Sequence, residues 1–456
     1  MLAKFKKKYI GDWDFYQKYL LLAIPMILQN AITNLVSFLD NIMVGQLGTE
    51  QMSGVAIVNQ LIFVYNLAIF GAVSAASIFG AQYFGKGNHK GHMYSFRFKL
   101  YATLLVTGGA ILLFLTKGSA LISLYLTDTV GNGATDLALQ YGLEYLAIMM
   151  VGLIPFAVNQ SYATNIKETG QTFIPMLASF VAVGTNAILD YLMIFGIGPF
   201  PELGVQGAAL ATVIARYIEA LIVVIWAHIH RGKNRYLEGA YTGFGIPLAE
   251  LKAILIKGFP LMMNEVLWAA GMTTVTQCYS VRGLDIASTI TNLFNIVYLQ
   301  LGSCISIVVG QYLGAGKLED AKDADNKMIV FSVFCCVIMA ALMFVVGGFF
   351  PGIYNTTEEI RELATSFIAV SAIIMPFCAF SHASYFTLRS GGKTVVTFLF
   401  DSVFTWVIVV PAAYLLAHFT GLGIVSIYFL VQGTELIKVI IGYLMVKSNV
   451  WVVQMV

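Results

Sequence analysis

Charge is scarce in this sequence: only 11% of its 456 residues are Asp, Glu, Lys or Arg, against about 25% in an average soluble domain. Because 58% of the residues are hydrophobic, a soluble globule could not cover its apolar surface with the polar residues available. Basic and acidic residues nearly balance, 26 to 24, which argues against a nucleic-acid partner. The composition therefore indicates an integral membrane protein.

Several chemical signatures are also missing. The five cysteines lie inside apolar runs without the spacing of a disulfide framework or metal site, so we interpret them as small buried side chains. There is no Gly-x-x-x-x-Gly-Lys-Ser/Thr phosphate loop, no symmetric channel filter, and no constellation of nucleophile or metal ligands. We therefore expect no enzyme, no cofactor and no nucleotide drive, and a purely structural scaffold fits poorly with acidic residues in apolar runs.

What the sequence has in abundance is long apolar runs. A membrane-spanning helix needs about 20 mostly apolar residues. The sequence predicts an all-α integral membrane protein with twelve such helices. They are expected near 17–43, 52–80, 94–116, 136–160, 171–197, 206–229, 252–280, 285–313, 326–348, 362–388, 394–417 and 423–446. The first run is too long for a signal peptide and follows Asp12 and Asp14, so we expect an uncleaved helix.

Lysine and arginine fall mainly on one side of these helices. If the amino terminus is cytoplasmic, 21 of the 26 basic residues lie in cytoplasmic segments and three lie outside, namely Lys117, Arg282 and Arg361. Arg216 and Lys438 lie within helices. The positive-inside rule therefore predicts a multi-pass protein of the cell inner (plasma) membrane with both termini cytoplasmic.

The two halves of the chain repeat each other. The segment Gln82–Gly87 (QYFGKG) ends the second helix, and Gln311–Gly316 (QYLGAG) ends the eighth. Pro25 in the first helix corresponds to Pro260 in the seventh. Since each half has six helices, the two lobes should be related by a pseudo-two-fold along the membrane normal, a plan typical of secondary transporters. The predicted amino-terminal lobe is 1–230 and the predicted carboxy-terminal lobe is 252–456. The cytoplasmic linker between them is 231–251.

Acidic residues within apolar helices usually mark ion or proton pathways, because an ionised carboxylate is costly in hydrocarbon. Asp190 shares a helix face with Asn186, so the two side chains could hold a proton or a small cation, or join helices. Asp40 is either a coupling residue or an interfacial acid. For Glu265 the alternative is a solvated or interhelical glutamate. Asp401 fits a favourable helix amino end better than a transport role.

Other residues are weaker candidates. Asn159 and Thr212 could converge on Asp190, although neutral polar groups often simply join helices. Pro25 and Pro260 are candidate bend points or fixed kinks. The residues considered for a soft substrate-binding wall are Met26, Gln29, Asn30, Met43, Met262 and Met263. Methionine is common in membrane helices, so an ordinary core role is the default.

These features together resemble the multidrug and toxic compound extrusion (MATE) family over nearly the whole chain. The resemblance rests on the repeated halves, Pro25 with Asp40, the Gln82–Gly87 motif with its echo, and Asn186 with Asp190. It implies a multidrug efflux antiporter that exports cationic or amphiphilic organic compounds as protons, or alternatively sodium ions, enter. The implied coupling residues are Asp40, Asn159, Asn186, Asp190 and Thr212, with Asp40 and Asp190 as a sodium site in the alternative, and helix bending near Pro25.

The resemblance also bears on the branch of the family. NorM-like members carry a carboxylate pair on helices seven and ten. Glu265 matches the first and is a candidate for second-lobe coupling, but the tenth helix has no acid in the second place. The pattern therefore resembles the DinF-like branch. We expect a monomer in contact with membrane lipid. A lipid-linked saccharide flippase of the same superfamily is the alternative, disfavoured because only Arg216 and Lys438 are basic within helices.

Overall fold

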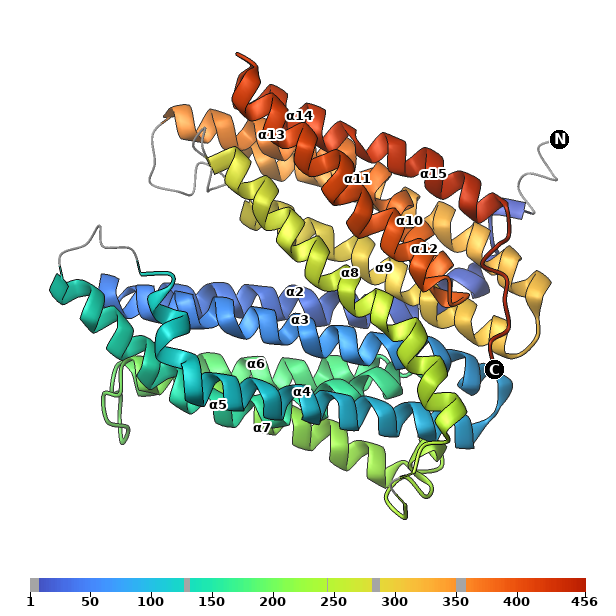
Figure 1. Cartoon of the computed structure of the whole chain (residues 1–456), viewed down its shortest axis with the longest axis horizontal. Helices are drawn as coiled ribbons and strands as arrows, with labels where there is room; N and C mark the ends of the chain where they lie inside the picture. Colours follow the sequence, from blue (N-terminus) through green and yellow to red (C-terminus); the bar gives the residue numbers. More distant parts are fainter. Residues whose placement is uncertain (1–7, 127–131, 244, 281–287, 350–357) are drawn as a thin grey trace. The chain divides into compact units, whose positions relative to one another are not determined.

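The computed structural model describes residues 8–126, 132–243, 245–280, 288–349 and 358–456. Within these ranges every regular element is a helix (Figure 1), and twelve helices are long and apolar enough to cross a membrane. The predicted all-α fold with twelve membrane helices is confirmed. The reason is physical: in hydrocarbon a helix satisfies all of its own backbone hydrogen bonds.

The helices follow the order expected from the apolar runs. Those of the first half are α2 (Trp13–Gly45), α3 (Thr49–Lys86), α4 (His89–Ser123), α5 (Asn132–Glu168), α6 (Phe173–Ile194) and α7 (Val205–Ile229). The first four of the second half are α8 (Leu248–Ser280), α9 (Ser288–Gly314), α10 (Leu318–Phe349) and α11 (Glu358–Ser390). The last two spans are divided into α12 (Thr394–Phe398), the π-helical turns η3 (Leu399–Val403) and η4 (Thr405–Val409), α13 (Val410–Phe419), α14 (Ile424–Gly433) and α15 (Glu435–Lys447).

Most helices extend beyond their predicted ends. The run predicted at 94–116 belongs to α4, which begins at His89 and ends at Ser123. An apolar run stops at the first charged residues, whereas helical hydrogen bonding continues past them. The predicted helix 285–313 begins in 281–287, outside the described residues. The basic residues Lys4, Lys6, Lys7 and Arg282 of the orientation argument also lie outside them.

The described chain divides into two compact units. The carboxy-terminal unit comprises 252–456 together with 1–27 and 78–88, and the amino-terminal unit comprises 28–77 and 89–251. The unit boundary between Leu251 and Lys252 falls where the predicted linker ends. Helices α2 and α3 contribute to both units, because the start of α2 and the end of α3 pack with the carboxy-terminal helices.

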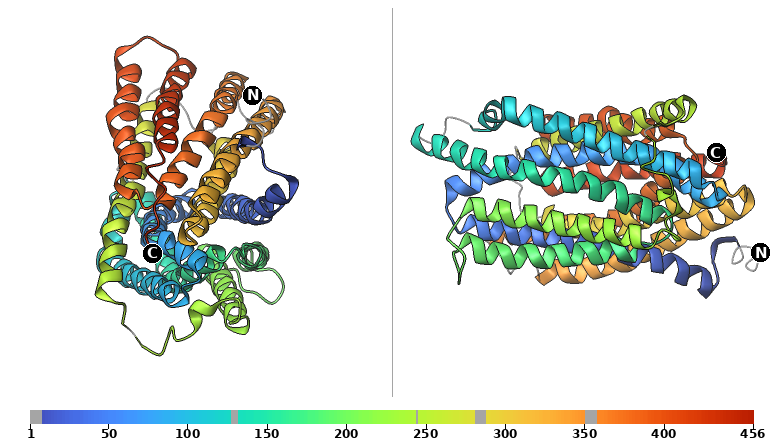
Figure 2. Two further views of the ribbon diagram at one scale, coloured as in Figure 1. Left: turned by 90° about the vertical axis from the view of Figure 1, so that its right-hand side faces the viewer. Right: turned by 90° about the horizontal axis from the view of Figure 1, so that it is seen from below.

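In the amino-terminal unit, α7 runs beside both α5 and α6, as Figures 1 and 2 show. Its core includes Tyr65 of α3, whose hydroxyl donates to the Leu153 carbonyl oxygen at 3.0 Å and lies 2.8 Å from the Thr107 hydroxyl. These bonds satisfy a phenol inside an apolar core, as burial of a polar group requires. They fix the relative positions of α3, α4 and α5.

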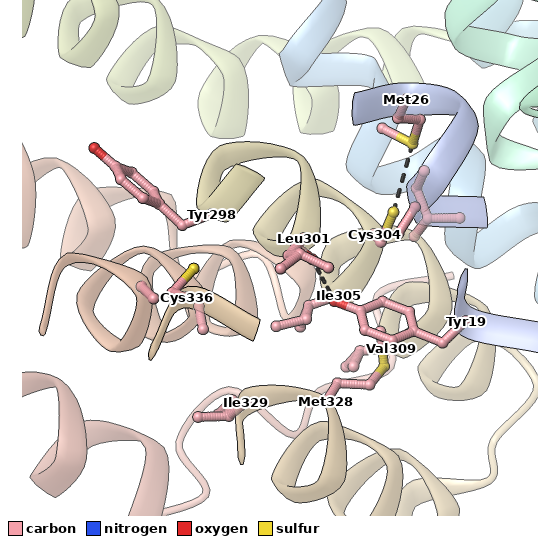
Figure 3. Packing of buried hydrophobic residues seen from close by; sticks show 14 of the residues in the cluster. Tyr19, Met26, Tyr298, Leu301, Cys304, Ile305, Val309, Met328, Ile329 and Cys336 are labelled. Atoms are coloured by element: carbon pink, nitrogen blue, oxygen red, sulfur yellow. Dashed lines mark hydrogen bonds between the residues drawn. The ribbon is translucent and has the colours of Figure 1, made fainter. Parts of the chain in front are cut away.

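The core of the carboxy-terminal unit joins the first turns of α2 to α9 and α10 (Figure 3). The Tyr19 hydroxyl donates to the Leu301 carbonyl oxygen at 2.8 Å. Met26 is 2% exposed, and its sulfur lies 3.5 Å from the Cys304 sulfur. The first half of α2 is therefore a core element of this unit.

The two repeated glycine motifs pack against each other in the carboxy-terminal unit. A β-carbon on Gly85 would overlap the backbone of Gln311, and one on Gly314 would overlap the backbone of Gln82. The Gln82 side chain also donates to the Ser390 carbonyl oxygen at 2.9 Å and accepts from the Met455 backbone N–H at 2.8 Å. The glycines allow this close approach, and the glutamine fixes the end of the chain.

The linker folds onto the amino-terminal unit. The Arg97 guanidinium donates to three backbone carbonyl oxygens, those of Gly239 and Gly245 at 2.7 Å and that of Ala240 at 2.9 Å. Tyr236 lies in the short helix η1 (Arg235–Leu237) and is 1% exposed, and its burial raises the pKa of the phenol well above its usual range. A neutral buried phenol and a clamped backbone make this part of the linker an ordered element of the unit.

Candidate functional site

The amino-terminal unit contains a pair of facing acids. The carboxyl groups of Asp40 on α2 and Asp190 on α6 lie close enough to interact directly. Asp190 is 1% exposed, and neither of its carboxyl oxygens has a hydrogen-bond partner among the described residues. Two ionised carboxylates that interact directly would repel each other in a medium of low polarity. A single proton shared between them removes this repulsion. The pair is therefore suited to bind a proton or another small cation.

Asn186 connects this pair to α7. It lies one turn before Asp190 and contacts that carboxyl group, while its amide nitrogen donates to the Thr212 hydroxyl at 3.4 Å. The structure therefore brings together four of the five predicted coupling residues. Asn186 links the group, because its side chain contacts both Asp190 and Thr212 on the neighbouring helix.

The fifth predicted residue, Asn159 on α5, belongs to a second polar group around Glu219 on α7. The Asn159 amide is hydrogen-bonded to the Glu219 carboxylate, and the Ser179 hydroxyl of α6 donates to that same carboxylate. Gln29 of α2 donates to Ser179 at 2.7 Å. Side chains of four helices of the unit thus form one polar group around the half-buried Glu219.

Sequence reasoning missed Glu219 and Ser179. Glu219 could have been found, because it lies inside the predicted helix 206–229, where an acid is costly. Ser179 carried no such signal, since a serine in a membrane helix commonly bonds to its own backbone. Its partnership with Glu219 depends on how α6 packs on α7.

Arg216 is a basic residue on α7, the helix that also carries Glu219. It donates to the Gly152 carbonyl oxygen at 3.4 Å, and its guanidinium carbon lies 5.2 Å from the centre of the Phe156 ring. It also interacts electrostatically with Glu219 and with Tyr145, whose hydroxyl donates to Asn59 at 3.3 Å. Arg216 therefore compensates part of the acidic charge from within the unit.

The carboxy-terminal unit holds its own charged group. Glu265 on α8 is half-buried, and its electrostatic neighbours include Arg389 and Asp401. Asp401 lies in η3, two turns inside its span, and accepts from Lys438 at 2.8 Å and from Asn264 at 3.0 Å. The explanation of Asp401 as a helix-end carboxylate was wrong, because an ion pair and an amide hold it.

The remaining candidates take different places. Pro25 is buried in α2 two residues before the boundary between the compact units, and Pro260 is half-buried inside α8. Met26 belongs to the hydrophobic core already described. Met43 packs against the core of the amino-terminal unit. Asn30 is half-buried, Met262 is exposed and Met263 is half-buried, and their roles as substrate contacts stay predictions.

Metal-ligating side chains do not gather into a larger cluster here. Over the described ranges, no group of three or more His, Cys, Asp and Glu side chains is placed to hold a metal ion. Sodium at Asp40 and Asp190 would rely on those two carboxylates and the neighbouring amide. The arrangement is chemically simpler for a proton, which needs only the facing carboxyl oxygens.

The comparisons with known proteins agree with this architecture. The model of the MatE family matches residues 25–192 and 272–415. The probable multidrug resistance proteins NorM of Thermotoga maritima and Halalkalibacterium halodurans are 23% and 24% identical over 413 residues, which cover 89% of this chain and 86% and 88% of those proteins. A solved structure, described as the outward-facing conformation of a multidrug resistance MATE family transporter of the MOP superfamily, is 19% identical.

That structure matches 96% of both chains with a TM-score of 0.85, so the fold is the same. The family model covers more than half of the chain and includes the acid pair and both halves of the repeat. This multi-pass membrane protein therefore belongs to the MatE (multidrug and toxic compound extrusion) family of transporters.

Proposed function

We propose that the protein is a secondary active antiporter that exports cationic or amphiphilic organic compounds in exchange for protons. The observation that carries this proposal is the pair of interacting carboxyl groups of Asp40, which is half-buried, and Asp190, which is buried. A cationic substrate and a proton can each offset part of the negative charge of the pair, so the binding of one weakens the binding of the other. Competition of this kind is the basis of exchange.

The mechanism follows from the charge of the pair. When both acids are ionised, the amino-terminal unit attracts a cation. When a proton bridges them, the pair keeps only one negative charge, so the attraction is weakened and a different packing of α2 against α6 becomes favourable. A preference of a few kcal/mol for one packing over the other shifts such an equilibrium by orders of magnitude. Pro25, which interrupts the backbone hydrogen bonding of α2, is the proposed bend point.

Sodium remains the alternative coupling ion, with Asp40 and Asp190 as its ligands and Glu265 as a second-lobe coupling residue. The stretch Phe377–His382 of α11, where the second acid of a NorM-like carboxylate pair with Glu265 is expected, contains no acid. This supports the DinF-like branch, although the two sequence relatives carry the NorM name. The proposal therefore gives the proton precedence.

The substrate class rests on the sign of the internal charge. Arg216 and Lys438, the two basic residues that the sequence placed within helices, are each engaged with carbonyl, carboxylate or aromatic groups of the protein. Neither is an open site for a pyrophosphate. This favours cationic or amphiphilic compounds over the anionic lipid-linked saccharides of the rival flippase function. The proposal includes a monomer in the cell inner membrane with both termini cytoplasmic.

The test is transport of ethidium, a fluorescent organic cation, by the full chain in proteoliposomes after a pH jump with sodium absent. We expect wild-type protein to move ethidium against the proton gradient, and Asp190→Asn to lose this flux. Asp136→Asn is the matched control, because Asp136 is an exposed acid of the same unit. Its flux should equal that of the wild type.

Unimpaired gradient-driven flux in Asp190→Asn would remove the acid pair from the mechanism. Flux that appears only after sodium is added would replace the proton by sodium as the coupling ion. If purified, monodisperse wild type moves no organic cation in either condition but moves a lipid-linked saccharide, the flippase function would be correct instead.

A further inference from the structure

Lys438 is an ionisable side chain that takes no part in the proposed exchange of protons at Asp40 and Asp190. It lies on α15, nine residues before the helix ends, and therefore about 13 Å from that end along the axis. Its side chain is 6% exposed, and it lies in the twelfth candidate membrane span. A buried ammonium there is expensive, so its partners must compensate it closely.

Those partners form a compact cage. The Lys438 ammonium donates to Asp401 Oδ1 at 2.8 Å and lies 3.7 Å from Glu435 Oε1. The rings of Phe400 and Phe404 face it, with their centres 5.6 and 5.7 Å away. Carboxylates and aromatic faces are both favourable surroundings for a monovalent cation. The ammonium therefore occupies the centre of a cation-binding environment.

The cage is held rigidly on the side of Asp401. Asn264 on α8 donates to Asp401 Oδ2 at 3.0 Å, and the Ser402 backbone N–H and hydroxyl both donate to Asn264 Oδ1, at 3.2 and 2.8 Å. Asp401 lies in a π-helical turn, a local distortion that frequently occurs at functional sites. The carboxylate is thus oriented towards Lys438 by the fold and does not depend on Lys438 for its position.

Charge counting shows what the cage requires. Asp401 and Glu435 are two acids, and Lys438 is one base. Glu435 Oε2 is buried and has no hydrogen-bond partner within the described ranges. Without the ammonium, both carboxylates would lose the cation that lies beside them in the structure. Hard oxygen ligands of this kind bind small cations such as sodium.

We propose that the Lys438 ammonium is a built-in counter-ion that fills the cation position of the carboxy-terminal unit, so that this unit binds no sodium ion. Lys438 thereby determines whether a sodium ion can bind between the carboxylates of the carboxy-terminal unit. The inference is independent of the proposed function, because Asp40 and Asp190 belong to the amino-terminal unit.

The experiment compares purified full-length wild type with Lys438→Met, which keeps the length of the side chain and removes its charge. Equilibrium binding of radioactive sodium and the Tm in sodium chloride against choline chloride are measured at one ionic strength. For wild type we expect no sodium binding that depends on Asp401. For Lys438→Met we expect one additional bound sodium ion and a rise in Tm on the order of a few °C with sodium.

Two further variants test whether the additional sodium binding depends on Asp401 and on the position of the lysine. Lys438→Met combined with Asp401→Asn should have the same net charge in the cage as wild type, because one acid and one base are removed together, and should lose the additional sodium binding. Lys447→Met is the matched control, because Lys447 is an exposed lysine on the same helix, and it should behave as wild type. The inference is overturned if a monodisperse Lys438→Met protein binds no additional sodium, or if wild type binds sodium that Asp401→Asn abolishes. The ethidium flux of Asp190→Asn tests the proposed function separately. Neither result of that test changes the sodium binding expected of the Lys438 and Asp401 variants.

Discussion

Gly85 of the first repeat motif lies directly on the backbone of Gln311 in the second, within the carboxy-terminal unit. The reciprocal contact, Gly314 on Gln82, completes a pseudo-symmetric pair. Each motif therefore supplies the glycine that the other needs for close approach. The repeat that identified two related halves in the sequence is also a packing device.

Substitution of this glycine should destabilise the fold. In Gly85→Ala the added methyl group overlaps backbone atoms, which cannot rotate away, so we expect a loss of about 1–3 kcal/mol of stability. Thermal unfolding in detergent measures it as a lowered Tm. Gly108→Ala is the control, since a β-carbon there meets nothing within 4 Å, and it should be neutral or slightly stabilising. An unchanged Tm in Gly85→Ala would contradict the close packing.

The linker should become accessible to protease when Arg97 is changed. Arg97→Lys retains the charge but cannot donate to three carbonyl oxygens at once, because an ammonium lacks the planar fork of a guanidinium. We expect trypsin to cleave several-fold faster at Arg231, Lys233 and Arg235 in this variant. Lys90→Ala, which removes an exposed basic residue of the same helix, should leave the cleavage rate unchanged. Equal rates in Arg97→Lys and wild type would show that the clamp does not order the linker.

Lys99 and Glu168 should behave as a buried unit. Lys99 is 0% exposed and donates to the carboxylate of Glu168, which also lies 3.3 Å from His92 Nε2. Removing only one charge leaves the other buried and uncompensated, so Lys99→Met should cost about 3–5 kcal/mol. Adding Glu168→Gln to that variant should recover part of the loss of Tm.

The exposed pair of Lys322 and Glu319 provides the comparison. Lys322→Met should change stability by at most about 1 kcal/mol, because water screens this pair. If Lys99→Met is no more destabilising than Lys322→Met, the buried ion pair does not contribute as its geometry suggests.

Binding of ethidium should strengthen as the pH rises. Protons and a cationic substrate compete for the pair of Asp40 and Asp190, and raising the pH removes the proton. Competition with a single proton changes Kd by at most about tenfold per pH unit. Fluorescence titration of purified protein measures this slope. Asp190→Asn should bind more weakly with a flatter slope, and Asp136→Asn should keep the wild-type slope.

The opposite slope, with tighter binding at low pH, would mean that protonation creates the substrate site. That outcome would exclude direct competition at the acid pair. A slope that is equally steep in Asp190→Asn would place the titrating group elsewhere in the protein.

The sequence by itself determined the twelve helices, the repeated halves and the placement of Asn186 and Asp190 on one helix face. Local properties suffice for these: the length of an apolar run decides that a span exists, and helical periodicity decides which side chains share a face. The helix ends were less well predicted, since helical hydrogen bonding does not stop where apolar residues do.

Only the tertiary structure decided which of these side chains meet. Asp40 faces Asp190, Ser179 joins Gln29 to Glu219, and Lys438 compensates Asp401. Each of these contacts joins different helices, and the rotation and register of one helix against another depend on all the side chains packed between them. No local pattern records that arrangement, which is why the partners of Glu219 and the ion pair of Asp401 could not be predicted from the sequence.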